Sequence, residues 1–318
     1  MDYKVSICIP AYKRTNFLER LLSSIAIQTY KNYEIIITDD SDDDSVKLLC
    51  EKYQSSLPIY YYKNEIQQGT PKNWMAAISK ATGEWVKLIH DDDWFSNENS
   101  LADYVSAISE GNRFIFSGYN AFYETTNEHI DKTISVNKFQ SVQKKPFLLF
   151  IENVIGPPSV VMFHKSVKDY YDEHLKWYVD IEYYISVLLK EKGTYITKPL
   201  VNVSYNDTQV TTYCKTNPEV EIPEGLYVYN KHKQEWPSYI MLYDTLWRSL
   251  RNTGIRSNDD LKRYSNNNSI PDFMKVMSTH QQYIPQSILK IGVFSKLFMV
   301  LSYLFNHNAI SNPKQAIS

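Results

Sequence analysis

The stretch WVKLIHDDD, residues 85–93, joins a short apolar segment directly to three consecutive aspartates. Its first five residues, Trp85–Ile89, predict a buried β-strand. Two earlier stretches are built in the same way. Val5–Ile9 is followed by the turn-forming PAYKR, and Glu34–Thr38 is followed by the acidic residues 39–44. Each of these strands therefore ends in polar residues.

Helical patterns separate the predicted strands. Apolar residues fall on one helical face between the first two strands, at positions 17–26, and further helices are predicted near Leu49 and around Trp74. Ile59–Tyr62 is a further strand. Such strand–helix alternation is typical of an α/β fold with a parallel, doubly wound sheet. Ligands of these sheets bind beyond the carboxyl ends of the strands. We therefore expect the three polar segments to converge at one edge.

The later chain has weaker periodicity. We predict a helix at 101–109, a strand at 114–119, a turn and strand at 151–163, a helix at 174–192 and a strand at 199–203. From about residue 215 the pattern is helical and polar. The predicted organisation is an α/β domain at 1–214, divided into halves at 1–110 and 111–214, and a helical region at 215–318.

Composition narrows the classes of function. The net charge is −2, which argues against a nucleic-acid binder. The chain has only 9 glycines and no glycine-rich phosphate loop. Three scattered cysteines argue against a disulfide framework. The apolar run at 5–9 is too short for a signal peptide, so we expect a cytoplasmic protein.

The two aspartate clusters have different interpretations. Adjacent carboxylates at Asp91–Asp93 repel one another, and a bound cation such as Mg²⁺ or Mn²⁺ relieves the repulsion; the alternative is an acidic surface turn. Asp39 is assigned to a ligand's ribose or base, whereas 42–44 suit solvent and helix capping. An EF-hand match starting at Asp40 lacks the required glycine, because Ser45 stands there.

Two further segments leave alternatives open. Asp180 and Glu182 lie among aromatic residues, where partial burial raises a carboxylate pKa towards that of a general base. The alternative is a pair of carboxylates at a helix N-terminus. Residues 289–305 are very apolar but too short to span a bilayer. They form either a buried helix or a helix on a membrane surface, with Lys290 and Lys296 near anionic head groups.

Four ordered motifs carry a family resemblance: VSICIPAYKR, QTYKNYEIIITDDS, NEIQQGTPKNW and AISKATGEWVKLIHDDDW, within residues 3–105. In this combination the chain resembles the family 2 glycosyltransferases with the GT-A fold, a Rossmann-like, mostly parallel sheet flanked by helices. Residues 155–163, 177–193 and 199–211 are similar, less closely, to the family's acceptor-side segments. The resemblance implies inverting transfer of a sugar from a nucleoside diphosphate sugar, typically with uracil as base, using a divalent metal.

The resemblance also assigns roles by position. The matching nucleotide-sugar residues are Pro10, Tyr12, Arg14, Asp39, Gly69, Lys72, Asn73, Asp91 and Asp92, and the matching metal residues are Asp92 and Asp93. Asp180 matches the catalytic base. The sequence departs from the family at His90, which stands at the first Asp of the metal motif, and at Val179, which replaces a Glu. Ser204-Tyr205-Asn206 replaces a later Arg-x-His motif.

The hypothesis is a metal-dependent enzyme of bacterial surface polysaccharide synthesis, such as O-antigen or capsule. Its acceptor is expected to be a glycan or polyprenyl-linked saccharide at the inner face of the cell membrane. A nucleotidyltransferase is the second hypothesis, although it predicts a glycine-containing loop after the first strand, and PAYKR has none. A catalytically inactive sugar-binding or scaffold protein of the same fold is the third.

Overall fold

A computed structural model of the chain describes residues 2–206, 213–233 and 240–311, with the side chains of 307–311 excepted. The chain divides into two compact units. One lies within Met1–Glu173 and Val179–Gln209, and the other comprises His174–Tyr178 and the described residues from 213 onward. The predicted boundary at 214/215 remains a prediction, because residues 207–212 lie outside the described residues.

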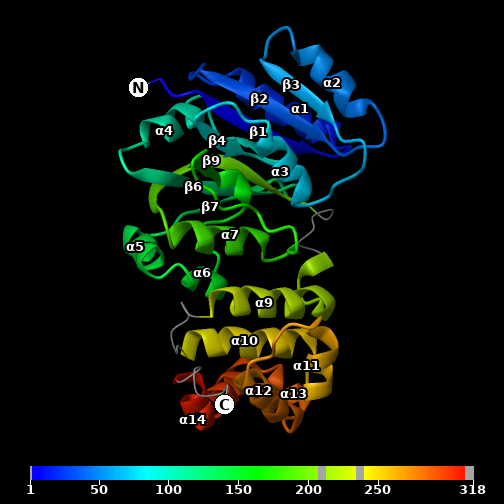
Figure 1. The fold of residues 1–318 in the computed structure, drawn as a ribbon, viewed down its shortest axis with the longest axis vertical. Coiled ribbons are helices and arrows are strands. Elements are labelled where there is room, and N and C mark those ends of the chain that lie inside the picture. Colours follow the sequence, from blue (N-terminus) through cyan, green and yellow to red (C-terminus); the bar gives the residue numbers. More distant parts are fainter. Residues whose placement is uncertain (1, 207–212, 234–239, 312–318) are drawn as a thin grey trace. The chain divides into compact units, whose positions relative to one another are not determined.

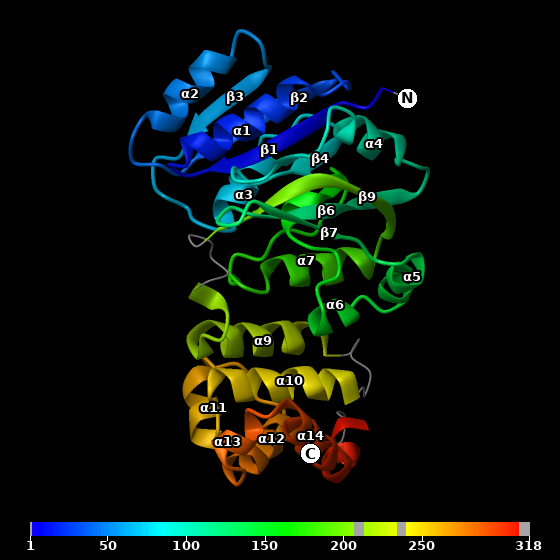
Figure 2. The same cartoon turned by 180° about the vertical axis from the view of Figure 1, so that it is seen from behind.

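The first unit is an α/β domain built on one nine-stranded sheet, with helices on both faces (Figures 1 and 2). Its first half contains β1 (Val5–Ala11), α1 (Thr15–Ala26), β2 (Tyr33–Asp39), α2 (Ser45–Tyr53), β3 (Ile59–Lys63), α3 (Lys72–Ser79), β4 (Trp85–Leu88), β5 (Trp94–Phe95) and α4 (Ser100–Ser106). Its second half contains β6 (Asn112–Tyr123), β7 (Glu128–Lys132), α5 (Val136–Lys144), α6 (Leu148–Ile151), the 3₁₀-helix η1 (Pro158–Val160), β8 (Val161–His164), α7 (Val179–Leu188) and β9 (Lys192–Tyr205).

The strand order is β3-β2-β1-β4-β8-β6-β9-β5, with β7 paired to β6. The first four strands are parallel, as the sequence predicts. Every residue of β1, β2 and β4 is buried, which explains why most of them are apolar, with Glu34 and Lys87 among the buried charged exceptions. From β4 onward the sheet is mixed: β8 runs antiparallel to both β4 and β6, whereas β9 is parallel to β6. The three polar segments that follow β1, β2 and β4 therefore share one edge.

Two predicted elements need correction. The helix predicted at 174–192 is shorter, because α7 begins at Val179 and residues 174–178 belong to the second unit. The strand predicted at 199–203 is longer, because β9 already begins at Lys192. The first half of β9 is partly buried to exposed and places Tyr195 and Ile196 among polar residues, so it has no apolar run from which a strand could be predicted.

The second unit is helical where it is described. Its elements are α9 (Pro218–His232), α10 (Ile240–Thr253), α11 (Asn258–Tyr264), α12 (Asp272–Gln282), α13 (Gln286–Leu289) and α14 (Gly292–Ser311). Leu242, Leu246 and Leu250 of α10 are buried at helical spacing and form part of its core. Among the described helices, none is both long enough and apolar enough to cross a bilayer.

Candidate active site

Asp91, Asp92 and Asp93 lie in the turn between β4 and β5, where they are only 1%, 5% and 2% exposed. The backbone N–H of Ile89 donates to the carbonyl of Cys8, 3.0 Å away, so the turn leaves the sheet beside the end of β1. These carboxylates are therefore part of the carboxyl-end edge and do not form an exposed acidic turn. The alternative interpretation of a surface turn is wrong.

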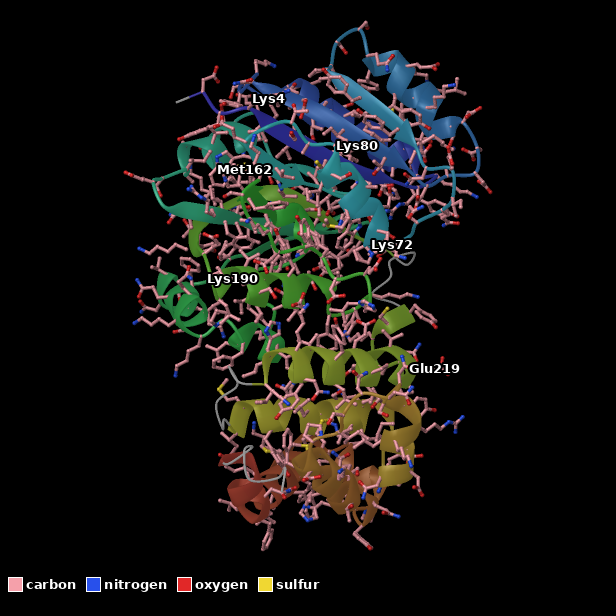
Figure 3. All side chains as sticks on the ribbon, viewed as in Figure 1. Lys4, Lys72, Lys80, Met162, Lys190 and Glu219 are labelled. Atoms are coloured by element: carbon pink, nitrogen blue, oxygen red, sulfur yellow. The ribbon has the colours of Figure 1, made fainter. Side chains whose placement is uncertain are left out.

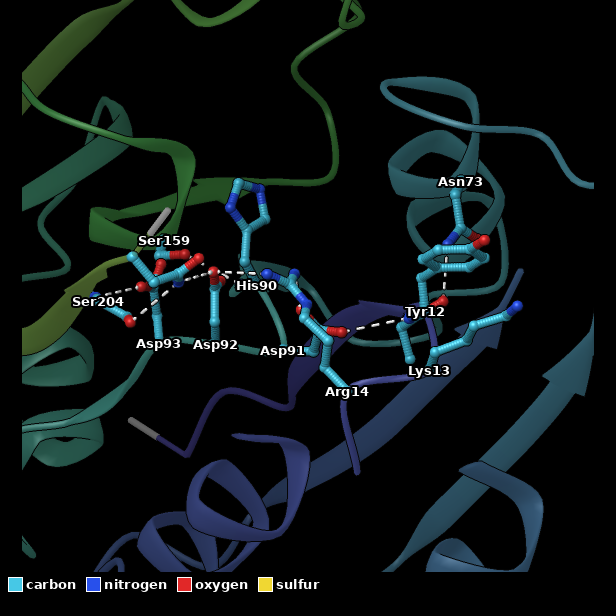
Figure 4. A network of polar contacts seen from close by, with 12 residues as sticks. Tyr12, Lys13, Arg14, Asn73, His90, Asp91, Asp92, Asp93, Ser159 and Ser204 are labelled. Carbon is cyan, nitrogen blue, oxygen red and sulfur yellow. Dashed lines mark hydrogen bonds and ion pairs between the residues drawn. The ribbon is translucent and has the colours of Figure 1, made fainter. Parts of the chain in front are cut away.

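The turn after β1 supplies the cation that faces this cluster. Arg14 donates through one guanidinium nitrogen to Asp92 at 2.8 Å and through the other to Asp91 (Figure 4). The backbone N–H of Tyr12 donates to Asp91 at 3.2 Å. The turn is held by Lys13, whose backbone has a positive φ of 60° and whose N–H donates to the Ser41 hydroxyl. Two predicted nucleotide-side residues thus contact two predicted carboxylates.

Burial determines the protonation behaviour of the cluster. It raises the pKa of Asp91 to about 7, although Arg14 lowers it, and it raises the pKa of Asp93 well above its ordinary value. Among the described residues, Arg14 alone forms ion pairs with this cluster, and it does so with Asp91 and Asp92 but not with Asp93. Without a metal the buried carboxylates of Asp91 and Asp93 therefore tend to hold protons, and a bound cation would take the place of these protons.

His90 completes a possible set of metal ligands. Ligand atoms of His90, Asp92 and Asp93 lie within 4.8 Å of one another. The imidazole Nε2 is buried and has no hydrogen-bond partner, and burial lowers the pKa of the ring to about 4, which keeps it neutral. A neutral imidazole with a free nitrogen beside two carboxylates fits a divalent metal.

Residues of two segments later in the chain, around Ser159 and at 204–206, also hydrogen-bond to this cluster. Ser159 accepts a hydrogen bond from the His90 backbone N–H at 2.9 Å and also bonds Asp93. The Ser204 backbone N–H donates to Asp93 at 2.9 Å, and the Asn206 amide lies 3.4 Å from Asp92. The segment that departs from the family's Arg-x-His motif therefore still contacts the acidic cluster. Ser159 and Ser204 were not among the candidates from sequence, because the contacts come from residues 69 and 111 positions away.

A second group of predicted residues lies along the ends of β2 and α3. Asp39 is fully buried; its carboxylate accepts hydrogen bonds from the Tyr61 hydroxyl at 2.7 Å and the Ser41 backbone N–H at 2.8 Å. The Asn73 amide donates to the carbonyls of Thr38 and Ala11. Both side chains are fixed by the protein, and the role of Asp39 towards a base remains a prediction.

Asp40 organises the loop that carries Gly69. Its carboxylate accepts from the backbone N–H groups of Gln68 and Gly69, at 3.1 and 2.7 Å, and from the Asn64 amide at 2.6 Å. Gly69 has a φ of +67°, a conformation that favours glycine. By contrast, 42–44 are exposed, as expected, but the N-cap residue of α2, Asp44, makes no side-chain capping bond; the Ser45 backbone N–H instead donates to the Asp43 carboxylate at 3.0 Å.

Pro10 and Lys72, two further residues predicted on the donor side, differ in burial and in their contacts. Pro10 is buried inside β1, opposite Thr38 of β2. Lys72 begins α3 and is about half exposed, and its ammonium forms a 3.3 Å ion pair with Glu173 (Figure 3). Lys72 is therefore the accessible cation of this segment, whereas Pro10 shapes the strand end.

Asp180 lies in the first turn of α7, half-buried. Burial raises its pKa to about 7, against hydrogen bonds that favour the charged form, one of them from its own backbone N–H. The others come from the Ile181 backbone N–H at 2.8 Å and from the Asn153 side-chain amide at 2.9 Å. Asn153 was not predicted from the sequence. Its other amide atom accepts from the backbone N–H groups of Ile155 and Gly156, so it is fixed in place.

Aromatic contacts connect the acidic cluster with the surroundings of Asp180. The Trp74 ring lies 4.7 Å from the His90 ring and 5.2 Å from the Tyr171 ring, measured between centroids. The Tyr171 hydroxyl is buried, and its pKa is raised by burial and also by the charge of Asp180. Asp180 and the acidic cluster therefore belong to one side of the same unit. Glu182, the other candidate carboxylate, is buried and bonded to Ser186.

A family model described as "Glycosyl transferase family 2" matches residues 6–171, which is more than half of the chain. The chain belongs to glycosyl transferase family 2. This assignment agrees with the resemblance carried by the four N-terminal motifs and argues against a nucleotidyltransferase. The matched range includes the acidic cluster and ends before Asp180.

Solved structures show the same fold. The chain resembles Staphylococcus aureus TarS 1–349 in complex with UDP, with a TM-score of 0.59 at 16% identity, covering 98% of this chain and 92% of that one. It also resembles the Pyrobaculum calidifontis mannosyltransferase PcManGT in complex with GDP-Man and Mn²⁺, with a TM-score of 0.56 at 12% identity, covering 96% and 87%. The family 2 chain therefore has the GT-A fold with a helical C-terminal region.

Curated relatives are similar over shorter stretches. The chain is 28% identical over 164 residues to the Escherichia coli UDP-Glc:α-D-GlcNAc-diphosphoundecaprenol β-1,3-glucosyltransferase WfgD, covering 51% of this chain and 60% of that protein. It is 29% identical over 151 residues to the Campylobacter jejuni GalNAc(5)-diNAcBac-PP-undecaprenol β-1,3-glucosyltransferase, covering 46% and 48%. The match to Streptococcus pneumoniae GlyA covers only 23% of that relative. The chain thus spans less than two thirds of these relatives.

Proposed function

We propose that this chain transfers a sugar, with inversion, from a nucleoside diphosphate sugar to a hydroxyl group of a glycan or lipid-linked saccharide. The observation that carries the proposal is the buried group of His90 and Asp91–Asp93 at the carboxyl-end edge, in the same unit as Asp180. The names of the E. coli and C. jejuni relatives, which include undecaprenol-linked saccharides, support a lipid-linked acceptor. Surface polysaccharide synthesis at the inner face of the cell membrane is the corresponding setting.

The donor side is assigned to the residues at the ends of β1, β2 and α3. Tyr12, Arg14, Asp39, Gly69, Lys72 and Asn73 are the proposed contacts, with Pro10 shaping the turn. Arg14 and Lys72 are the cations available to a diphosphate. UDP is the proposed nucleotide, supported by the UDP complex of TarS and the UDP-Glc in the name of WfgD.

A divalent metal is the proposed cofactor, with His90, Asp92 and Asp93 as its protein ligands. When bound, the metal supplies positive charge that offsets the charge developing on the diphosphate leaving group. Asp91, which bonds Arg14 and the Tyr12 backbone, is assigned to holding the turn and to donor contacts. We propose Mn²⁺ over Mg²⁺, because one of the three ligands is an imidazole nitrogen.

Asp180 is the proposed general base. A carboxylate with a pKa near 7 is ionised in a large fraction of molecules at neutral pH, yet is basic enough to accept a proton as the acceptor hydroxyl attacks. The hydroxyl oxygen forms its bond to the anomeric carbon as the bond to the diphosphate breaks. One displacement from the opposite face inverts that carbon. The chain's own contribution is to hold the carboxylate through Asn153 and Ile181.

The test uses the purified chain with UDP-sugars and Mn²⁺. We expect Asp180→Asn to lower kcat by 10² to 10⁴-fold, the usual contribution of a general base, while UDP binding stays unchanged. Asp92→Asn is expected to abolish the dependence of activity and of UDP binding on Mn²⁺. Asp43→Asn is the matched control, because Asp43 is exposed and lies outside the site.

Two results contradict these assignments. Full transfer by Asp180→Asn removes this residue as the base, and an unchanged Mn²⁺ response in Asp92→Asn removes the metal site. If the wild-type chain binds UDP and Mn²⁺ but transfers and hydrolyses no donor, the inactive sugar-binding alternative replaces the enzymatic one.

A further inference from the structure

Helix α14 has its polar and apolar faces reversed relative to an ordinary surface helix. Its inward positions, at helical spacing, are Ser295, Met299, Ser302 and Asn306, which are 1%, 0%, 2% and 5% exposed. Three of these four are polar. Its outward positions are apolar: Val293, Phe294, Leu297, Leu301, Leu304 and Phe305, between 43% and 82% exposed. A helix that packs onto a core normally does the opposite.

The buried polar side chains of α14 are hydrogen-bonded, and these bonds fix which face of the helix points inward. The Ser295 hydroxyl accepts from the Trp247 indole N–H at 3.1 Å and from the Arg251 guanidinium at 3.0 Å. The Ser302 hydroxyl bonds the Tyr243 hydroxyl at 2.5 Å and the His280 Nδ1 at 2.7 Å. Turning the helix over would bury the apolar residues but break these bonds. The apolar face is therefore held outward by the unit itself.

We infer that the outward face of α14 is a docking surface for an anionic lipid membrane. Contiguous exposed apolar side chains at helical spacing mark an interaction surface. Residues 293–305 extend about 18 Å along the helix, far less than the roughly 30 Å of a bilayer core, so the helix lies along a membrane instead of crossing it. Lying at the interface with the apolar side chains inserted is the established behaviour of such helices.

Charge selects the lipid surface over a second copy of the chain. Residues 273–318 contain four lysines, at 275, 290, 296 and 314, and no Asp or Glu. Lys290 and Lys296 flank the apolar face and are exposed, although Lys296 also pairs with Asp244 of α10 at 3.3 Å. In a twofold dimer the same patch meets itself, so its lysines would face its lysines, and the neighbouring Asp244 is already paired with Lys296. An anionic membrane offers the complementary charge.

This inference goes beyond the proposed chemistry, because it concerns where the enzyme is held. Membrane binding needs neither donor nor metal, so it is tested separately. A chain that transfers no sugar can still bind a membrane, and a chain that binds no membrane can still transfer a sugar.

The experiment is co-sedimentation of the full chain with vesicles of phosphatidylcholine, with and without phosphatidylglycerol. We expect binding to the phosphatidylglycerol vesicles, and a more than tenfold loss in the triple variant Leu297→Gln, Leu301→Gln, Phe305→Gln. Lys290→Gln with Lys296→Gln is expected to lose affinity by about fivefold per lysine on anionic vesicles only. The matched control is Leu48→Gln with Ile66→Gln, two exposed apolar residues of the first unit, 58% and 75% exposed.

All substituted side chains are exposed, so each variant is expected to keep the wild-type thermal transition and circular dichroism. Wild-type chain that stays in the supernatant overturns the proposal, as does a triple variant that binds like wild type. A wild-type dimer that the triple variant converts to a monomer, without vesicle binding in either, overturns it in favour of an interface between copies. Equal binding to neutral and anionic vesicles overturns the charge argument.

Discussion

At the scale of single residues, the site depends on side chains whose ionisation is set by burial. Asp180 has its pKa raised to about 7 by burial, against hydrogen bonds from the Asn153 amide, the Ile181 backbone N–H and its own backbone N–H. Of these donors, the Asn153 amide is the side chain. Asn153 is therefore the residue through which the behaviour of the base can be changed.

We predict that Asn153→Ala and Asn153→Asp shift the pH profile of kcat/KM to higher pH. A hydrogen bond to a carboxylate favours its charged form, so its loss raises the pKa of Asp180 further. The rising limb, near pH 7 in the wild type, is expected to move up by about one pH unit in Asn153→Ala. It moves further in Asn153→Asp, because that carboxylate repels the base while still accepting the bonds from Ile155 and Gly156.

The pH profile of kcat/KM distinguishes an effect of Asn153 on the pKa of Asp180 from a purely structural effect. Both variants are expected to recover activity at alkaline pH, and Asn137→Ala, an exposed residue of α5, is expected to keep the wild-type profile. Activity lowered by the same factor at every pH would mean that Asn153 only supports the loop.

At the scale of elements, hydrogen bonds and an ion pair link the parallel strands at the end of the sheet opposite the site. The Glu34 carboxylate of β2 accepts from the Lys4 ammonium at 2.7 Å, the Ser6 hydroxyl at 2.5 Å and the Thr82 backbone N–H at 2.8 Å. The Ser6 hydroxyl also accepts from the Gly83 N–H at 2.8 Å. One buried carboxylate thus joins β1, β2 and the segment before β4.

We predict that Glu34→Gln destabilises the fold in a pH-dependent way. Burial alone would raise the pKa of Glu34, but the bonds from Lys4, Ser6 and Thr82 lower it to about 2. The unfolded chain has a pKa of about 4.3, so the charged carboxylate contributes its full stability above that pH. Glu34→Gln is expected to lower the free energy of unfolding by about 2 kcal/mol at pH 7.

The difference is expected to shrink as the pH falls from about 4 towards about 2, because the wild-type carboxylate is then protonated as well. Urea unfolding at several pH values measures it, with the exposed Glu84→Gln as control. A difference that is constant with pH would mean that packing, not ionisation, accounts for the loss.

The elements also show what the sequence can and cannot predict. The strands β1, β2 and β4 were predictable because they are buried throughout, so most of their residues are apolar. Strand β7 is exposed at all five positions and has no hydrophobic period to detect. Its pairing with β6 is made by backbone hydrogen bonds, which do not require particular residue types.

The same contrast holds within the site. Asp91–Asp93 are adjacent in sequence and follow a buried strand, so their clustering and location were predictable. The contact between Asn153 and Asp180 spans 27 positions and depends on a loop between α6 and η1 for which periodicity predicts nothing. The ligand role proposed for His90 rests on its burial and its unpartnered nitrogen, which only coordinates reveal.

At the scale of the whole molecule, the chain has two compact units, and the two proposed ligands act on different ones. Every proposed donor and metal contact lies in the α/β unit. The proposed membrane surface lies on α14 of the helical unit. Each ligand is therefore expected to protect its own set of backbone amides, whatever the arrangement of the units.

We predict separate footprints in hydrogen exchange, because a bound ligand stabilises the segments that it contacts. UDP with Mn²⁺ is expected to slow exchange in segments 9–15, 64–73, 89–95 and 203–206 and to leave α10 and α12 unchanged. Phosphatidylglycerol vesicles are expected to slow exchange within 290–305 and to leave the first unit unchanged.

Asp92→Asn is the control for the first footprint, since it removes the metal-dependent part alone, and the α14 triple variant is the control for the second. Protection by UDP that spreads equally over both units would contradict the assignment of the donor site to the α/β unit, because it would require the helical unit to contribute to donor binding.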